Sequence, residues 1–222
     1  MRRPDLVVVV AGTATEVGKT FVGAGLLSGL RATGMRVAAR KPAQSFAPGD
    51  LRTDADVLAA ATDDDPGAVC PPHRWYETPM APPMAAEALG RPSFTVDDLV
   101  TELRWPEAVD AGLVETAGGV RSPIAGDGDC ASLARALGPD LVVLVADAGL
   151  GTINAVRLSA GALARLPLVV LLNRFDRADE LHERNRLWLD GRDGFEVVTT
   201  VDALVERVGS ISTRVDQQGP PA

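Results

Sequence analysis

The sequence has few of the residues that build zinc sites and disulfide frameworks. It contains two cysteines, Cys70 and Cys130, without Cys-x-x-Cys spacing, and two histidines, His73 and His182, far apart in the chain. This spacing argues against a zinc site. Two cysteines do not make a disulfide framework, so we expect both to be free thiols in a reducing compartment.

Long hydrophobic runs are also missing. The longest ones, such as 6–12 and 141–146, are far shorter than the roughly 20 residues that a helix needs to cross a bilayer. The first of them leads into a phosphate-loop pattern instead of a signal cleavage site. The net charge of -8 argues against broad binding to nucleic acid or to an anionic membrane. We therefore expect a cytoplasmic protein with neither kind of partner.

Apolar runs and helix-like segments alternate through most of the chain. Hydrophobic residues make up 46% of the sequence, enough for a packed core. The runs without polar alternation, typical of strands buried on both faces of a sheet, are 6–10, 36–39, 111–115, 141–146 and 166–172. The segments with helical spacing are 19–32, 53–61, 96–103, 130–137, 152–165 and 178–190. This order predicts an α/β protein with a three-layer, Rossmann-like P-loop fold and a mainly parallel sheet.

One proline-rich stretch, 63–92, interrupts the alternation. Hydrophobic residues, Trp75 and Tyr76 are mixed with the prolines, so we interpret it as an ordered excursion with one short helix near 84–89. The length fits a single domain, which we place at 1–210. The segment 211–222 is expected to be a flexible tail.

The segment 12–20, Gly-Thr-Ala-Thr-Glu-Val-Gly-Lys-Thr, follows a strand and opens a helix, as a phosphate-binding loop must. In such a loop, backbone N–H groups wrap a phosphate, Lys19 neutralises the outer phosphates and the Thr20 hydroxyl can ligate Mg²⁺. The strict motif has glycine where this chain has Thr13. The alternative is a glycine-containing turn that happens to end in Gly-Lys-Thr.

A P-loop alone does not distinguish kinases, GTPases, motor ATPases and ligases. Lys41 follows the second strand, at the edge where ligands of open α/β sheets bind, and could stabilise charge during phosphoryl transfer. It could equally be a surface lysine. Asp54 begins a predicted helix, where capping chemistry is the simpler explanation.

Carboxylate and amide side chains end the later strands. Glu115 comes before a glycine-rich turn and is placed for the metal of a bound nucleotide, although Asp147 ends another strand and could take that role. The segment 149–154 offers free N–H groups for a carboxylate, or is simply a tight turn. Asn173 ends a further strand, where its amide can bind a base edge or cap the strand.

In this order, the motifs resemble those of the dethiobiotin synthetase family. They are Gly-Thr-x-Thr-x-Val-Gly-Lys-Thr at 12–20, Lys-Pro at 41–42, Val-Glu-x-x-Gly-Gly at 114–119 and Gly-x-Ile-Asn at 151–154. The proline-rich piece 79–87 is also similar to a family segment. The resemblance covers roughly residues 5–175 and its motifs are specific as a set.

The resemblance implies an ATP- and Mg²⁺-dependent ligase that makes dethiobiotin from 7,8-diaminononanoate and CO₂, through a carbamate and a carbamic-phosphoric anhydride. Lys19 and Lys41 would be the catalytic residues. Thr20, Asp54 and Glu115 would arrange the metal. The other residues implied for the nucleotide are Glu16, Val17, Gly18, Phe21, Thr116, Ala117, Gly118 and Asn173. Those implied for the substrate are Thr15, Ser45, Gly151, Thr152, Ile153 and Asn154, the last four serving a partner's site in a homodimer.

The chain also differs from the family pattern. Thr116 stands where the family usually has glycine, Arg121 adds a cation near the proposed substrate entry, and 197–204 has no clear Pro-x-Leu segment. Alternative functions are a related P-loop ligase acting on another amine or carboxylate, and a regulatory nucleotide-binding ATPase. The chain is too short for the glutamine-hydrolysing domain of one such ligase group, and a second lysine near the start of the loop, typical of partitioning ATPases, is missing.

Overall fold

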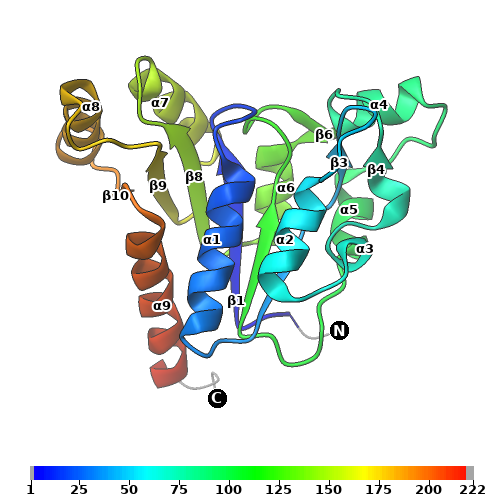
Figure 1. Cartoon of the computed structure of the whole chain (residues 1–222), viewed down its shortest axis with the longest axis horizontal. Helices are drawn as coiled ribbons and strands as arrows, with labels where there is room; N and C mark the ends of the chain where they lie inside the picture. The colour runs from blue at the N-terminus through cyan, green and yellow to red at the C-terminus, as the bar shows by residue number, and fades with distance from the viewer. Residues whose placement is uncertain (1–2, 219–222) are drawn as a thin grey trace.

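The protein is built on a parallel sheet (Figure 1). The computed structural model describes residues 3–218. Six strands have the order β10-β9-β8-β1-β5-β2. Their bounds are β1 Leu6–Gly12, β2 Val37–Arg40, β5 Ala111–Glu115, β8 Leu141–Asp147, β9 Leu168–Asn173 and β10 Val197–Val198. The predicted α/β P-loop fold is confirmed.

The central strands are buried because their side chains are apolar on both faces. β1 pairs with β5 on one side and β8 on the other, all parallel. Val9 and Val10, neighbours on β1 that point to opposite faces, are both fully buried. Helices cover both faces of the sheet, so both faces of each central strand need apolar side chains. The valine-rich runs are therefore continuously hydrophobic and do not alternate with polar residues.

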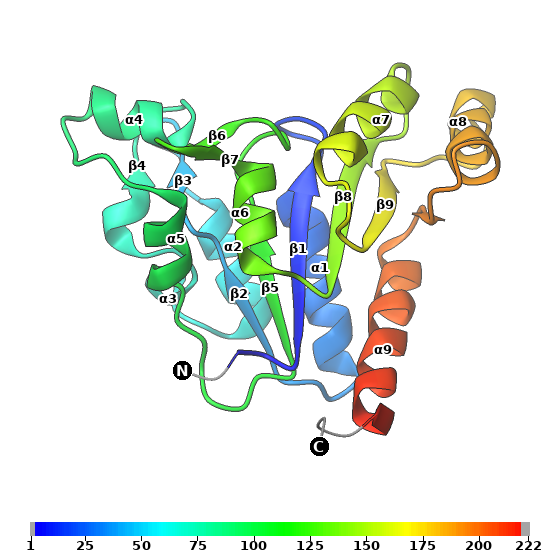
Figure 2. The ribbon, with the colours of Figure 1, turned by 180° about the vertical axis from the view of Figure 1, so that it is seen from behind.

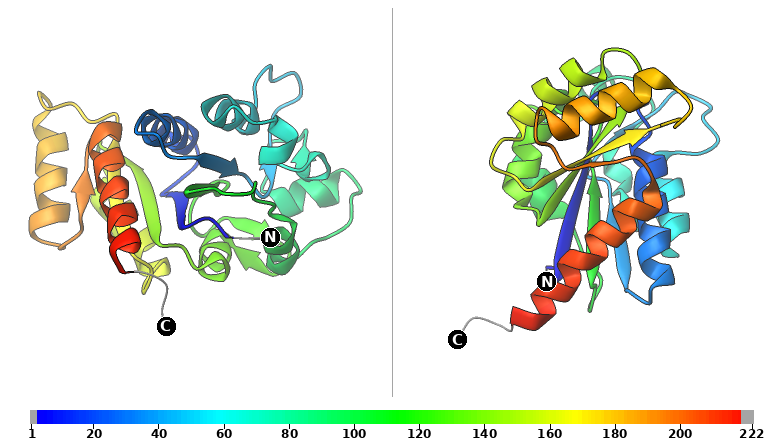
Figure 3. Two further views of the ribbon diagram at one scale, coloured as in Figure 1. Left: turned by 90° about the horizontal axis from the view of Figure 1, so that it is seen from below. Right: turned by 90° about the vertical axis from the view of Figure 1, so that its left-hand side faces the viewer.

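Helices cover both faces of the sheet, as the two opposite views show (Figures 1 and 2). α1 (Lys19–Ala32), α2 (Asp54–Thr62) and α9 (Val201–Gln218) lie on one face, and α6 (Cys130–Leu137) and α7 (Thr152–Ala162) lie on the other. α8 (Glu180–Gly191) packs beyond β9 and β10 (Figure 3). None of the helices in the described residues is both long and apolar enough to cross a membrane.

The proline-rich excursion is ordered and packs on the rest of the protein. It contains α3 (Pro66–Val69), the 3₁₀ turn Pro72–Arg74, and β4 (Trp75–Tyr76), which pairs with β3 (Gln44–Ser45). The expected short helix is α4 (Pro82–Ala88). α5 (Val96–Glu102), β6 (Pro123–Ala125) and β7 (Gly128–Asp129) follow it. Their shared core is centred on Tyr76, Phe94, Leu99, Ile124 and Leu133.

The chain ends in an element that the sequence pattern did not predict. Residues 211–218, expected to begin a tail, belong to α9, and 219–222 lie outside the described residues. The flexibility of 211–222 and the single domain at 1–210 stay predictions. α9 packs against α1 where α1 has glycine: a Cβ at Gly25 would lie 3.0 Å from Val201, and one at Gly29 would overlap Val205.

This close helix contact predicts that Gly29→Val destabilises the protein. Overpacking of a filled contact costs about 1–3 kcal/mol. Urea unfolding measures the change. The matched control is Gly209→Ala on α9, where an added Cβ meets open space, so the substitution should stabilise by about 0.5–1 kcal/mol. Equal stability of Gly29→Val and wild type would contradict the packing of α9 on α1.

Candidate active site

The loop between β1 and α1 has the backbone geometry of a phosphate cradle. Gly18 has φ 94°, a left-handed conformation that glycine adopts at little cost, and it immediately precedes α1. A Cβ at Gly12 would lie 2.9 Å from both the Ala14 carbonyl oxygen and the Val17 side chain. The first N–H groups of α1 therefore point out of a tight turn, as anion binding requires.

Lys19 begins α1 and reaches back over this loop. Its Nζ donates to the Ala14 carbonyl oxygen at 3.0 Å, and only 7% of the residue is exposed. Burial lowers the pKa of Lys19, and the nearby charge of Lys41 lowers it further. A bound polyphosphate would supply the negative charge that this buried ammonium lacks.

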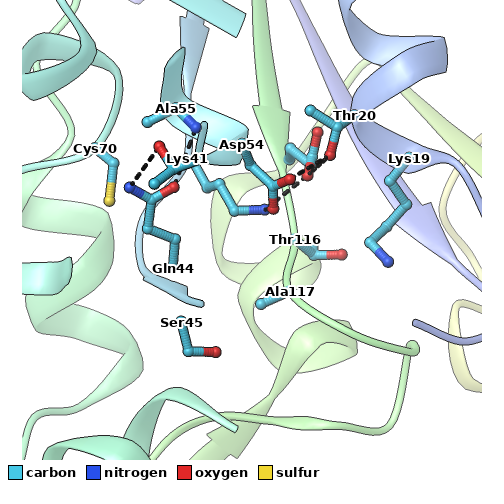
Figure 4. A network of polar contacts seen from close by, with 12 residues as sticks. Lys19, Thr20, Lys41, Gln44, Ser45, Asp54, Ala55, Cys70, Thr116 and Ala117 are labelled. Carbon is cyan, nitrogen blue, oxygen red and sulfur yellow. Dashed lines mark hydrogen bonds and ion pairs between the residues drawn. The ribbon is translucent and has the colours of Figure 1, made fainter. Parts of the chain in front are cut away.

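A cluster of opposite charges lies beside the loop, at the carboxyl ends of β2 and β5 (Figure 4). Lys41 Nζ lies 2.6 Å from Glu115 Oε1 and 2.7 Å from Asp54 Oδ2. The Thr20 hydroxyl lies 2.9 Å from both Asp54 Oδ1 and Glu115 Oε1. Four residues from four separate segments thus meet in one cluster, in which the Lys41 ammonium and the Thr20 hydroxyl each contact both carboxylates.

The cluster is deeply buried on one side and open on the other. Glu115 is fully buried, and 2% of Lys41 is exposed, whereas the Asp54 side chain is 46% exposed. Burial alone would lower the pKa of Lys41, but the charges of Glu115 and Asp54 outweigh it and raise that pKa. Partial burial works against ionisation of Asp54, yet Lys41 holds the pKa of Asp54 below its ordinary value. Lys41 therefore stays protonated at neutral pH.

A cavity of about 400 Å³ opens above the loop and the cluster. Its lining includes the predicted residues Thr15, Glu16, Gly18, Lys19, Thr20, Lys41, Ser45, Asp54, Ala117 and Gly118. A second, smaller cavity of about 290 Å³ shares Thr15, Ser45, Ala117 and Gly118 with it and continues along 79–82. The two lysines of the sequence, Lys19 and Lys41, both line the larger cavity.

Four other residues predicted for the nucleotide do not line either cavity. Val17 is buried, and Thr116 is fully buried with its hydroxyl donating to the Val10 carbonyl oxygen at 3.3 Å. Asn173 Nδ2 donates to the Val17 carbonyl oxygen at 2.9 Å and lies against Gly18, where a Cβ would collide with it. Phe21 is 67% exposed. Their roles toward a nucleotide stay predictions.

The predicted segment 151–154 does not line either cavity. It lies at the N-terminus of α7, where Gly151 has φ 91°. Thr152 is 5% exposed, and its Oγ1 has no hydrogen-bond partner among the described residues. Leu150, next to it, is 92% exposed. A role for this segment at a partner's site therefore stays a prediction.

Sequence reasoning gave no role to several polar residues at the cavity or its loop. Arg174 donates to the Glu16 carbonyl oxygen at 2.8 Å and so holds the loop, and Arg52 lines the cavity. Gln44 also lines it and is 2% exposed. The only sequence signal for Gln44 and Arg52 was their position close to Lys41 and Asp54. That position does not distinguish them from other polar residues nearby.

The donor set fits Mg²⁺. Oε2 of Glu115 is buried without a hydrogen-bond partner among the described residues, and Thr20 and Asp54 present further oxygens beside it. Among the side chains that the structure describes, no three or more His, Cys, Asp or Glu residues form a cluster that could hold a metal alone. Mg²⁺ commonly takes one or two carboxylates and completes its shell with phosphate oxygens and water.

Comparison with solved structures places the fold. The signal recognition particle receptor FtsY from Elizabethkingia anophelis has a TM-score of 0.55 at 16% identity, covering 95% of this chain and 66% of that chain. A plasmid partition protein from Borrelia burgdorferi B31 bound to AMPPNP has a TM-score of 0.55 at 11% identity, covering 98% of this chain and 100% of that chain. At such identities these similarities concern the fold alone.

Sequence comparison identifies the family. A family model described as an AAA domain matches residues 7–211. The ATP-dependent dethiobiotin synthetase BioD of Anaeromyxobacter sp. (strain Fw109-5) is 42% identical over 179 residues, covering 77% of this chain and 78% of that protein. The protein of the same name from Rhodococcus jostii (strain RHA1) is 37% identical over 216 residues, covering 93% and 90%. The resemblance drawn from the motifs is confirmed, and the chain belongs to the ATP-dependent dethiobiotin synthetase family, whose members are ligases that form C–N bonds.

Proposed function

We propose that the protein converts 7,8-diaminononanoate, CO₂ and ATP into dethiobiotin, ADP and phosphate. The observation that carries the proposal is the meeting of Lys19, Lys41 and Asp54 at one cavity, with the buried Glu115 in contact with Lys41. A ring-closing ligase of this kind needs two cations for phosphate and carbamate oxygens, and oxygen ligands for a metal, but no enzyme nucleophile.

The reaction requires that three reactants be held in line. One amine of the diamine adds to CO₂ and loses a proton, giving a carbamate. A carbamate oxygen attacks the γ-phosphorus of ATP and ADP leaves, which gives a carbamic-phosphoric anhydride. The second amine attacks the carbamic carbon, phosphate leaves with the anhydride oxygen, and the cyclic urea closes. Each step needs proximity and charge stabilisation, which the enzyme supplies by positioning.

The two lysines would stabilise the negative charges that these reaction steps involve. Lys19 would hold the outer phosphates from the loop side, and Lys41 would face the carbamate and the transferring phosphoryl group from the cluster side. Thr15 and Ser45 would contact the diamine, because both line the cavities where they join. Mg²⁺ bound by Thr20, Asp54 and Glu115 would neutralise charge on the β- and γ-phosphates.

The direct test combines purified protein, ATP, Mg²⁺, bicarbonate and 7,8-diaminononanoate. We expect dethiobiotin by mass spectrometry and phosphate in equal amount, both dependent on the diamine. Phosphate release that does not need the diamine would indicate a nucleotide-hydrolysing protein and overturn the proposal. Consumption of a related amine, with no reaction of the diamine, would show that the protein is a ligase for another substrate.

The nucleotide base and the compartment belong to the proposal as well. Asn173 would contact the adenine through the side-chain oxygen, since its Nδ2 already donates to Val17. Small soluble substrates and ATP suit a cytoplasmic enzyme.

A homodimer would complete the substrate site. The N-terminus of α7, where Gly151 and Asn154 are exposed, suits the carboxylate tail of the diamine. Because 151–154 lies outside both cavities, it would serve the site of a second subunit. The exposed Leu150 and Leu158 on and beside α7 suit such a contact.

This arrangement predicts complementation between two variants. Asn154→Asp should raise the KM for the diamine, because its charge repels the carboxylate, without changing the KM for ATP. Co-expression with Lys19→Ala, which lacks turnover, should give roughly a quarter of wild-type activity at low diamine, because half of the dimers contain one intact mixed site. Activity no higher than that of the Asn154→Asp homodimers present would place both functions in one subunit.

A further inference from the structure

Gln44 is a buried amide directly after the segment that carries Lys41. It lies on β3, lines the larger cavity and is only 2% exposed. A buried amide that lacks hydrogen-bond partners costs free energy. The hydrogen-bond partners of Gln44 therefore indicate the role of its side chain.

Both partners belong to the first turn of α2. Gln44 Oε1 accepts from the Ala55 N–H at 3.1 Å, and Gln44 Nε2 donates to Thr53 Oγ1 at 3.3 Å (Figure 4 labels Gln44 and Ala55). Thr53 and Ala55 are the two neighbours of Asp54 in the chain. One side chain from β3 thus contacts both neighbours of this carboxylate, the backbone N–H of Ala55 and the side-chain hydroxyl of Thr53.

The N-cap of α2 is formed within the helix. Thr53 is the N-cap and forms a capping box with Asp56, which satisfies the N–H groups of these two residues, whereas the N–H of Ala55 donates to Gln44. The contact to Gln44 comes from outside the helix and adds a restraint between α2 and the Lys41 segment. Its contribution is one of position.

Asp54 needs such a restraint. Its side chain is 46% exposed, so packing alone does not fix it, yet Asp54 Oδ2 lies 2.7 Å from Lys41 Nζ and Oδ1 lies 2.9 Å from the Thr20 hydroxyl. A shift of the first turn of α2 by an ångström would break both contacts. Glu115, by contrast, is fully buried on a central strand.

We propose that Gln44 is a positioning residue that fixes the first turn of α2, so that Asp54 meets Lys41, Thr20 and the metal of the bound nucleotide. This inference rests on the proposed function. Residues that orient metal ligands typically change metal affinity or activity by about 10- to 100-fold when they are replaced.

The test uses Gln44→Leu, which removes both hydrogen bonds, and Gln44→Glu, which keeps the acceptor for Ala55 N–H and removes the donor to Thr53. Mn²⁺ binding in the presence of a non-hydrolysable ATP analogue, followed by electron paramagnetic resonance, serves as a readout without turnover. We expect weaker Mn²⁺ binding by about 10- to 100-fold for Gln44→Leu and a smaller loss for Gln44→Glu. In steady-state assays, the Mg²⁺ requirement should rise while the KM for the diamine stays unchanged.

The control is Asp98→Ala, which breaks the equivalent capping box on α5, away from the cavity. It should lower thermal stability without changing Mn²⁺ binding. Gln44 variants that lose stability but bind Mn²⁺ like the wild type would overturn the proposal. If Gln44→Leu does not fold, wild-type Mn²⁺ binding by Gln44→Glu would overturn it equally. Failure of the wild type to make dethiobiotin, with Mn²⁺ and analogue still bound, would count against the proposed function and leave this test valid.

Discussion

Replacing Lys41 by methionine is expected to stop dethiobiotin formation while the protein still binds ATP. Lys41 is the cation placed opposite the loop, so its loss removes charge stabilisation at the reacting phosphoryl group, worth about 10³-fold in rate. Lys19 and the loop amides are untouched, so calorimetric titration should give near wild-type affinity for ATP. Product formation within a few-fold of wild type would contradict the role of Lys41.

The same variant tests the arrangement of charges in the cluster. Without the ammonium, the carboxylates of Glu115 and Asp54 have no cation beside them. Removing one partner of a buried ion pair lowers the stability of a protein by about 3–5 kcal/mol, so we expect Lys41→Met to be destabilised. Mg²⁺ bound at the two unpaired carboxylates would compensate their charge. Added Mg²⁺ should therefore raise the melting temperature of Lys41→Met more than that of the wild type. Equal shifts would contradict this expectation.

Replacing Lys19 by alanine is expected to abolish the binding of nucleotide. Lys19 begins α1 with its ammonium buried over the loop, and no second lysine is available to take its place, since Lys41 is paired with Glu115 and Asp54. Loss of one buried charge partner corresponds to about 100-fold in affinity or more.

The matched comparison is the stability of the unliganded variant. Lys19 makes one hydrogen bond to a carbonyl oxygen, and burial already lowers its pKa, so Lys19→Ala should melt close to the wild type. Thermal unfolding with and without ATP measures both effects. ATP should raise the melting temperature of the wild type only; an equal rise in Lys19→Ala would contradict the role of Lys19.

The sheet and the phosphate loop could be predicted because local sequence determines them. Val7 to Val10 leave no polar face, which requires a strand covered on both sides, and Gly18-Lys19-Thr20 is read from the loop itself. α9 was missed although Val201, Leu204, Val205 and Val208 recur with helical spacing. What no local pattern gives is its packing against glycines of α1, far away in the chain. β10 is two residues long, too short for any periodicity.

The site was predictable where a strand end fixes the side chain and less so elsewhere. Glu115 ends a central strand, as its place in the sequence predicts, and it lies in the cluster with Lys41. Asp54 reads as a helix-capping residue in sequence, and its contact with Lys41 appears only when α2 packs beside β2. Gln44 belongs to no recognisable motif. Its hydrogen bonds to Thr53 and Ala55 depend on how the chain turns between β3 and α2, which no rule of residue spacing describes.

Oxygen transfer from bicarbonate to phosphate tests the central claim most directly. With bicarbonate labelled by carbon-13 and oxygen-18, the proposed attack of a carbamate oxygen on the γ-phosphorus places one oxygen-18 atom in the released phosphate. The urea carbonyl of dethiobiotin should carry carbon-13 and the other oxygen-18 atom. Phosphate without oxygen-18, observed while labelled dethiobiotin forms, would contradict phosphorylation of a carbamate at this site.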